Sequence, residues 1–159
     1  MKLDLDRQDI GRSELELAGE IDLAMGEGRP GKAQVAGSLV IQNLEARVLA
    51  TGTLPATGIA ECARCLATFE CRWPVPVDLM VLRDVDSDEE EGETLLILQR
   101  DGEVDLREPV RECAVLAFPP APVCREDCRG PCAASGADRN HTECDCEEED
   151  FDPRWEGLP

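Results

Sequence analysis

The stretch E-C-A-R-C-L-A-T-F-E-C-R-W-P-V-P-V-D-L-M-V, residues 61–81, decides the fold. From residue 69 to residue 81 an apolar side chain occupies every second position. Such alternation predicts a strand with one buried face. Because proline cannot donate a ladder hydrogen bond, Pro74 and Pro76 restrict this strand to a sheet edge or a bulge. The C-A-R-C sequence at 62–65 then forms a tight turn between this strand and the preceding one.

The same alternation continues outward from this stretch. It marks residues 13–24, 35–41 and 44–54, and a short apolar strand fits residues 95–98. Successive strands of this kind, separated by short turns, are typical of antiparallel sheets with one face on the core and one in solvent. The pattern therefore predicts an antiparallel β meander or an open barrel.

One helix is expected near residues 106–118, and Pro119 and Pro120 end it. Its apolar face has the i, i+3, i+4, i+7 spacing of a helix and consists of Val110, Cys113, Ala114 and Ala117. Asp105 and Glu108 have the spacing of a capping box; alternatively, Pro109 occupies the first helical position. The expected fold class is α+β: mainly an antiparallel β meander or open barrel, with one C-terminal helix and a cysteine-rich zinc-binding segment.

The chain divides into three parts by composition. Residues 1–123 are expected to form a β-rich core domain, and residues 124–146 form a cysteine-rich segment without apolar periodicity. Residues 147–159 form an acidic tail that carries Phe151 and Trp155. The acidic run at 84–93 is expected to be a solvated loop of the core domain.

The charge and the aromatic content narrow the range of partners. The 159 residues include 35 acidic and 16 basic side chains, a formal net charge of −19, and only three Phe, two Trp and no Tyr. This charge repels phosphate backbones and attracts basic partners, although acidity also serves solubility alone. Few aromatic rings are available to stack on unpaired bases. A general nucleic-acid binder is therefore disfavoured.

The chain is expected to be cytoplasmic and to have no membrane partner. No window approaches the roughly 20 apolar residues that a membrane span needs. The first residues, M-K-L-D-L-D-R, lack the apolar run of a signal peptide.

Nine cysteines in a chain without an export signal point to metal or redox chemistry rather than to structural disulfides. Zinc takes four ligands in a tetrahedron, usually supplied as two close pairs. The preferred zinc site joins the turn cysteines to two from the downstream segment: Cys62, Cys65, Cys124 and Cys128. A second, weaker site would use Cys132, His141, Cys144 and Cys146.

Other interpretations of the cysteines stay open at this point. Cys71 and Cys113 lie on apolar faces and are expected in the core. A C-x-x-C pair is also the motif of thioredoxin-type redox proteins, but such a pair opens a helix in a βαβ unit, which this sequence lacks. Plain reduced cysteines are the third alternative.

Catalysis is not expected. The single histidine, His141, lies inside the cysteine-rich segment, so no Ser-His-Asp or Cys-His arrangement can be placed on the core. The sequence has no glycine-rich phosphate loop.

Three segments carry a family resemblance: E-C-A-R-C-L-A-T-F (61–69), D-L-R-E-P-V-R-E (105–112) and P-P-A-P-V-C-R-E-D-C-R-G-P-C (119–132). In this order they resemble the YceD-type proteins, named for accumulation of the large-subunit ribosomal RNA. The resemblance implies a factor without enzymatic activity that supports normal levels of that RNA and takes part in large-subunit assembly. The positions that match the family motif are Cys62, Cys65, Leu66, Cys124, Cys128, Gly130, Cys132, Cys144 and Cys146.

The chain departs from the longer family members at one position. Where they tend to read C-P-x-C-G, this chain reads C-A-A-S-G at 132–136, so Ser135 stands where a cysteine is expected. Serine is a poor zinc ligand. The second site therefore depends on His141 or on both thiols of the Cys144 and Cys146 pair.

Three functional hypotheses follow. The first is a factor for ribosomal RNA accumulation or large-subunit assembly, whose partners are ribosomal proteins or a large-subunit precursor. The second is a thiol- or zinc-responsive redox regulator. The third is a direct RNA-binding module that uses a local basic patch of Arg64, Arg125, Arg129 and Arg139. Alternatively, these arginines pair with the nearby acidic residues Glu61, Glu126, Asp127 and Asp138.

Overall fold

The computed structural model of the protein describes residues 1–24, 26–83, 95–99 and 101–146. The described part contains seven strands and one helix. They are β1 (Lys2–Asp4), β2 (Gly11–Asp22), β3 (Lys32–Asn43), β4 (Arg47–Glu61), β5 (Thr68–Leu82), β6 (Leu95–Leu98), β7 (Glu103–Asp105) and α1 (Arg107–Ala117). All the expected strands and the expected helix are therefore present.

The long strands form one five-stranded sheet in the order β2-β3-β4-β5-β6. β2 to β5 pair antiparallel in sequence order, which confirms the meander. Within the described residues the sheet is open, with β2 and β6 at its edges, so no closed barrel forms. β6 joins β5 in parallel, and β1 pairs with β7 in a separate two-stranded sheet.

The prolines of β5 lie where the sheet has an edge. β6 pairs only with Leu79–Leu82, so among the described strands Pro74 and Pro76 have β4 on one side only. This is the edge position that a missing N–H donor requires.

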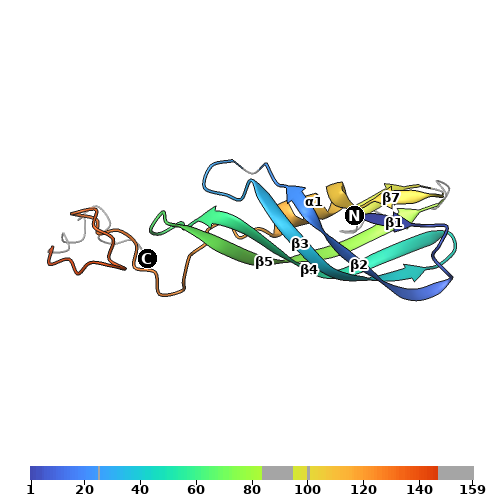
Figure 1. Ribbon diagram of the computed structural model, residues 1–159, viewed down its shortest axis with the longest axis horizontal. Coiled ribbons are helices and arrows are strands. Elements are labelled where there is room, and N and C mark those ends of the chain that lie inside the picture. Colours follow the sequence, from blue (N-terminus) through green and yellow to red (C-terminus); the bar gives the residue numbers. More distant parts are fainter. Residues whose placement is uncertain (25, 84–94, 100, 147–159) are drawn as a thin grey trace, which may run out of the picture.

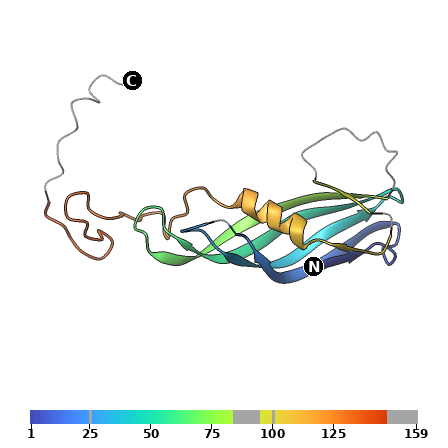
Figure 2. The same cartoon turned by 90° about the horizontal axis from the view of Figure 1, so that it is seen from above.

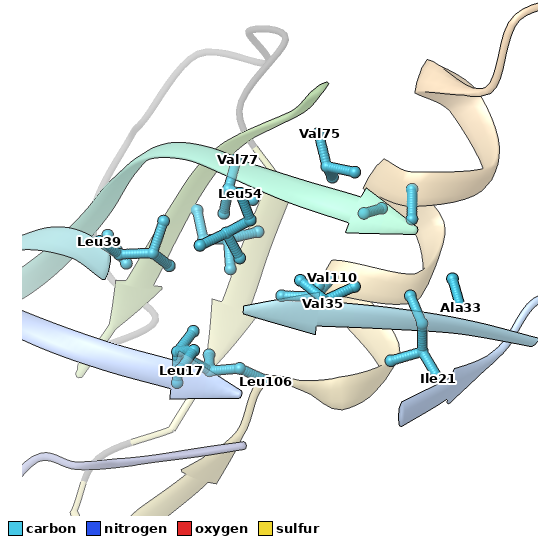
Figure 3. Packing of buried hydrophobic residues seen from close by; sticks show 14 of the residues in the cluster. Leu17, Ile21, Ala33, Val35, Leu39, Leu54, Val75, Val77, Leu106 and Val110 are labelled. Atoms are coloured by element: carbon cyan, nitrogen blue, oxygen red, sulfur yellow. The ribbon is translucent and has the colours of Figure 1, made fainter. Parts of the chain in front are cut away.

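The core lies on one face of the sheet, beneath α1 and the β1–β7 pair (Figures 1 and 2). Alternate residues of the strands point into it, including Leu39, Leu54 and Val75, all fully buried. Figure 3 shows Leu106 beside Leu17 of β2 and Val110 beside Val35 of β3, within the buried cluster. Burial of apolar surface on this face, at about 25 cal/mol per Å², is the main stabilising contribution to the domain.

The helix packs on β5 through an aromatic anchor. Trp73 is 3% exposed, and its Nε1–H donates to the carbonyl oxygen of Ala114 at 3.1 Å. Its ring meets that of Phe118 edge-on, with centroids 5.0 Å apart. Val110 and Ala114 are buried as the spacing predicts, whereas Cys113 and Ala117 are half-buried.

The helix begins at Arg107, next to the expected residue 106, but neither arrangement predicted for its first turn forms. The N-cap is Leu106, and it makes no side-chain capping bond. The Asp105 carboxylate instead accepts the backbone N–H of Arg107, and Glu108 pairs with Arg111. Pro109 is the third helical residue rather than the first. Leu106 is fully buried, so core packing rather than a capping box fixes this end.

The acidic run at 84–93 and the tail at 147–159 lie outside the described residues. The division of the chain at residues 123 and 146 stays a prediction. Figure 1 shows that the segment after α1 leaves the helical layer and runs past the end of the sheet where β4 turns into β5. That end carries the first cysteines.

Candidate metal centre

The turn between β4 and β5 is a knuckle closed by its own backbone. The N–H of Cys62 donates to the carbonyl of Ala67, and the N–H of Leu66 donates back to the carbonyl of Cys62, both at 2.9 Å. Leu66 adopts a left-handed conformation with φ 62°. This geometry turns both thiols of C-A-R-C toward the same point, and the Arg64 N–H donates to the sulfur of Cys62.

The segment after α1 is tied to this knuckle by hydrogen bonds from Ala63 and Arg64. The N–H of Ala63 donates to the carbonyl of Pro122 at 2.8 Å. The guanidinium of Arg64 donates to the carbonyls of Glu126 (3.1 Å) and Cys128 (2.9 Å). These bonds place the two downstream cysteines beside the two of the turn.

The four sulfur atoms of Cys62, Cys65, Cys124 and Cys128 lie within 4.8 Å of one another. The Sγ atoms of Cys62 and Cys128 are 3.8 Å apart, as are those of Cys65 and Cys124. A disulfide would need about 2.0 Å. A tetrahedron with metal–sulfur bonds of about 2.3 Å has edges of about 3.8 Å, so this group has the dimensions to hold a metal ion.

The four cysteines are partly or fully buried, and as thiolates they would carry negative charge that a cation can neutralise. Cys62 and Cys128 are buried, and Cys65 and Cys124 are half-buried. Burial opposes ionisation of Cys62, but N–H donors from Cys65, Cys124 and Arg64 lower its pKa to about 6. Burial, together with the neighbouring sulfurs of Cys62 and Cys128, raises the pKa of Cys124 to about 12. A divalent cation would stabilise all four thiolates together.

A second knuckle follows at residues 132–137, with the backbone pattern of the first. The N–H of Cys132 donates to the carbonyl of Ala137, and the N–H of Gly136 donates back to the carbonyl of Cys132, both at 2.8 Å. Gly136 has φ 70°, where Leu66 has φ 62°. Ser135 therefore occupies the place that Cys65 holds in the first knuckle.

The second knuckle gathers three further cysteines. The Sγ atoms of Cys132, Cys144 and Cys146 lie within 4.8 Å of one another, with Cys132 and Cys144 at 3.3 Å. The Ser135 hydroxyl is 3.2 Å from Cys144 Sγ. The side-chain hydroxyl of Ser135, with backbone N–H donors, lowers the pKa of Cys132 to about 6.

His141 does not belong to this group in the structure. Its side chain is exposed, and its Nε2 lies 3.8 Å from a carboxylate oxygen of Asp138. Cys71 and Cys113 lie apart from both clusters, and Cys71 is buried in the core while Cys113 packs against it. Burial raises the pKa of both thiols.

Sequence reasoning missed Asn140, which lies between Cys132 and Cys144 in the chain and contacts the segment of the first cluster. The side-chain oxygen of Asn140 accepts the backbone N–H of Arg129 (2.9 Å) and a guanidinium N–H of Arg125 (2.8 Å). Its amide nitrogen is 3.5 Å from Cys128 Sγ. No spacing or composition signal singles out this asparagine.

The four arginines proposed as a basic patch have different roles. Arg64 is engaged with backbone carbonyls rather than with the acidic side chains suggested as partners. Arg125 pairs with Asp127 at 3.4 Å. Arg129 is exposed, and Arg139 is exposed with interactions inside the protein.

Both cysteine clusters lie in a part of the chain that matches a known protein family. The sequence profile of the family described as large ribosomal RNA subunit accumulation protein YceD matches residues 50–159. The chain belongs to the YceD family. The match begins within β4 and extends through the knuckle of β4–β5, α1 and both cysteine clusters.

Similar curated proteins come from mycobacteria. The uncharacterized proteins Mb2951c of Mycobacterium bovis and Rv2926c of Mycobacterium tuberculosis are each 35% identical over 121 residues, which is 76% of this chain and 58% of theirs. The uncharacterized protein ML1660 of Mycobacterium leprae is 28% identical over 102 residues, 62% of this chain and 46% of its own. This YceD-family chain thus spans about half the length of these relatives.

No solved structure matches the chain. In the described part of this YceD-family protein, no helix has the length and apolar character needed to cross a membrane.

Proposed function

We propose that this protein is a non-enzymatic factor that supports accumulation of large-subunit ribosomal RNA and acts in assembly of the large ribosomal subunit through protein contacts. One observation carries the proposal: the YceD family profile covers residues 50–159, which include the sheet edge, the helix and both cysteine clusters. The family's description supplies the role in RNA accumulation.

The proposed partners are basic ribosomal proteins or a large-subunit precursor in the cytoplasm. The net charge of −19 supports this choice, because it attracts basic proteins and repels exposed phosphate. Two arginines of the knuckle region, Arg64 and Arg125, are held by groups of the protein itself. This arrangement favours a protein contact over direct binding of RNA.

The metal that we assign to the first cluster is zinc. Four cysteines with sulfur separations of 3.8 Å fit a closed, tetrahedral Cys₄ site, the form that structural zinc takes. Cys62, Cys65, Cys124 and Cys128 would hold the ion. A zinc ion there supplies no reaction chemistry; it cross-links the segment after α1 to the end of the sheet. The surface formed by the knuckle and this segment is then rigid enough to bind a partner.

A pull-down from native cells tests this function. Tagged protein is isolated with and without nuclease, and co-purifying ribosomal proteins and RNA are quantified. We expect large-subunit components to be enriched and to survive nuclease. The Cys62→Ser variant should lose them, whereas Cys113→Ala, which lies outside both clusters, should retain them.

The other outcomes separate the competing functions. Enrichment that nuclease abolishes indicates a direct RNA-binding module. Enrichment that is absent in both samples overturns the ribosomal role. Loss of zinc and of partners on mild peroxide treatment, with unchanged RNA levels on depletion, indicates a redox regulator.

A further inference from the structure

We propose that Cys132, Cys144 and Cys146 form a second zinc site with three thiolates and one oxygen ligand, from which the ion exchanges more readily than from the first cluster. This inference goes beyond the proposed ribosomal role and does not rest on it; only the comparison of exchange rates uses the zinc proposed for the first cluster. It concerns the metal chemistry of this chain, which can be measured on the purified protein.

The backbone of the second knuckle shows that it is built to present ligands. Residues 62–67 and 132–137 share two reciprocal backbone hydrogen bonds and a left-handed residue at the fifth position. In both knuckles a backbone N–H also donates to the first cysteine's sulfur, from Arg64 in the first and from Ser135 in the second. The second turn thus repeats the backbone arrangement that presents Cys62 and Cys65 to the first cluster.

Two distant cysteines complete the second group. Cys144 Sγ lies 3.3 Å from Cys132 Sγ, and Cys146 Sγ is within 4.8 Å of both. The chain between them and the knuckle is folded back by an isolated bridge between Pro131 and Asp138 and by the N–H of Thr142, which donates to Asp138. The fold therefore brings Cys132 together with two cysteines that lie 12 and 14 residues further along the chain.

The fourth ligand of this site is an oxygen atom, from the Ser135 hydroxyl or from water. Ser135 stands where the first knuckle has the ligand Cys65, and its hydroxyl is 3.2 Å from Cys144 Sγ. A neutral hydroxyl, or a water in its place, binds zinc far less strongly than a thiolate. Zinc sites with three protein ligands and an exchangeable fourth ligand are open, whereas four-thiolate sites are closed.

The cysteines of the second site are also more exposed to solvent than those of the first. In the first cluster Cys62 and Cys128 are buried, but in the second no sulfur-bearing residue is buried and Cys146 is exposed. A competing chelator or a metal-accepting protein can therefore approach the second ion directly. We infer that the second site exchanges zinc under conditions in which the first retains it.

The experiment measures zinc on the full-length reduced protein, loaded with excess zinc and desalted. Native mass spectrometry gives the number of ions per chain, and a chromogenic chelator gives the release kinetics. We expect two ions in the wild type, one released at least about tenfold faster than the other. Cys132→Ser should remove only the fast ion, and Cys62→Ser only the slow one.

The Ser135→Cys variant is the decisive test, because it adds a ligand and does not depend on damaging the fold. It should slow release of the second ion to a rate close to that of the first. Ser135→Ala, in which only a hydroxyl is lost, should leave the second ion fast. Of the two Ser135 variants, only Ser135→Cys should increase the thiolate-to-metal absorption of the cobalt-loaded protein.

Three results would overturn the proposal. One is a single zinc per wild-type chain. Another is release of both ions at one rate in the wild type. The third is a second ion whose retention depends on His141, seen as faster release in His141→Ala with no effect of Ser135→Cys.

Discussion

Gly130 lies at the point where the downstream segment touches the first knuckle. Its φ is 68°, and a Cβ atom there would lie 3.1 Å from the carbonyl oxygen of Arg64. Both the backbone conformation and the close approach require glycine. The residue therefore fixes how near Cys128 can come to Cys62.

Gly130→Ala is expected to weaken metal binding at the first cluster by about 5- to 30-fold. The left-handed conformation costs a residue with a Cβ about 1–2 kcal/mol, and the contact with backbone adds to this cost. Chelator competition on the purified protein measures the effect. Gly102→Ala is the matched control, because Gly102 also has a positive φ (78°) but has open space around its Cβ position.

Gly102→Ala should lower the stability of the domain and leave metal binding unchanged. If the two variants bind metal equally well, the contact between Gly130 and Arg64 has no part in forming the cluster.

The cysteines of the first cluster could be chosen from spacing alone, since two close pairs are what a tetrahedral site needs. The residues that bring the two cysteine pairs together could not be identified from the sequence. Arg64 reaches carbonyls 62 and 64 residues away, and Asn140 reaches Cys128 across 12 residues. Hydrogen bonds to backbone groups leave no pattern in a single sequence. Ser135 could be recognised as a missing thiol, but its place opposite Cys65 follows only from the backbone of the two knuckles.

At the scale of elements, α1 and β5 depend on each other through Trp73. The helix ends at Ala117, and the N–H of Phe118 donates to Val115 rather than to Ala114. The indole N–H supplies the donor for the Ala114 carbonyl instead. One side chain of the sheet thus completes the last turn of the helix.

Trp73→Phe is expected to destabilise the protein by about 1–3 kcal/mol. The substitution leaves the buried Ala114 carbonyl without its donor and removes part of the ring that meets Phe118. Urea denaturation followed by far-UV circular dichroism measures the loss. Leu116→Ala serves as the control, because Leu116 is 85% exposed and its truncation should change stability by less than about 0.5 kcal/mol.

A Trp73→Phe variant as stable as Leu116→Ala would mean that the hydrogen bond to Ala114 contributes nothing to the docking of the helix.

The long elements could be predicted because each has enough residues to show its period. β2 to β5 alternate over 12 to 15 residues, and α1 keeps a helical face over 11. β1 and β7 have three residues each, which is too short for a period, and they were not anticipated. The capping box was misassigned because the Asp105 carboxylate accepts the N–H of Arg107, while Glu108 pairs with Arg111 instead of reaching back to residue 105.

Across the whole molecule, the hydrophobic core and the cysteine clusters occupy different regions. The core cluster of buried residues runs from Leu3 to Phe118 and contains nothing from the described part of the chain beyond it. In Figure 2 the segment after α1 extends past the end of the sheet. The sheet and helix are held by apolar burial, whereas the segment from 119 to 146 contributes no residue to that core and is ordered by hydrogen bonds and by the cysteine groups.

Removal of metal is therefore expected to unfold the cysteine-rich region and to leave the sheet intact. With a strong chelator, far-UV circular dichroism should keep its strand signal, because no core residue is lost. Trypsin should gain cuts after Arg125, Arg129 and Arg139, since metal binding offsets the chain entropy of this segment. Cys62→Ser with zinc present should give the same cuts after Arg125 and Arg129, and Cys113→Ala should not. Strand signal and cleavage pattern that collapse together on chelation would instead mean that the metal sustains the entire fold, and the separation of core and clusters argued from burial would be wrong.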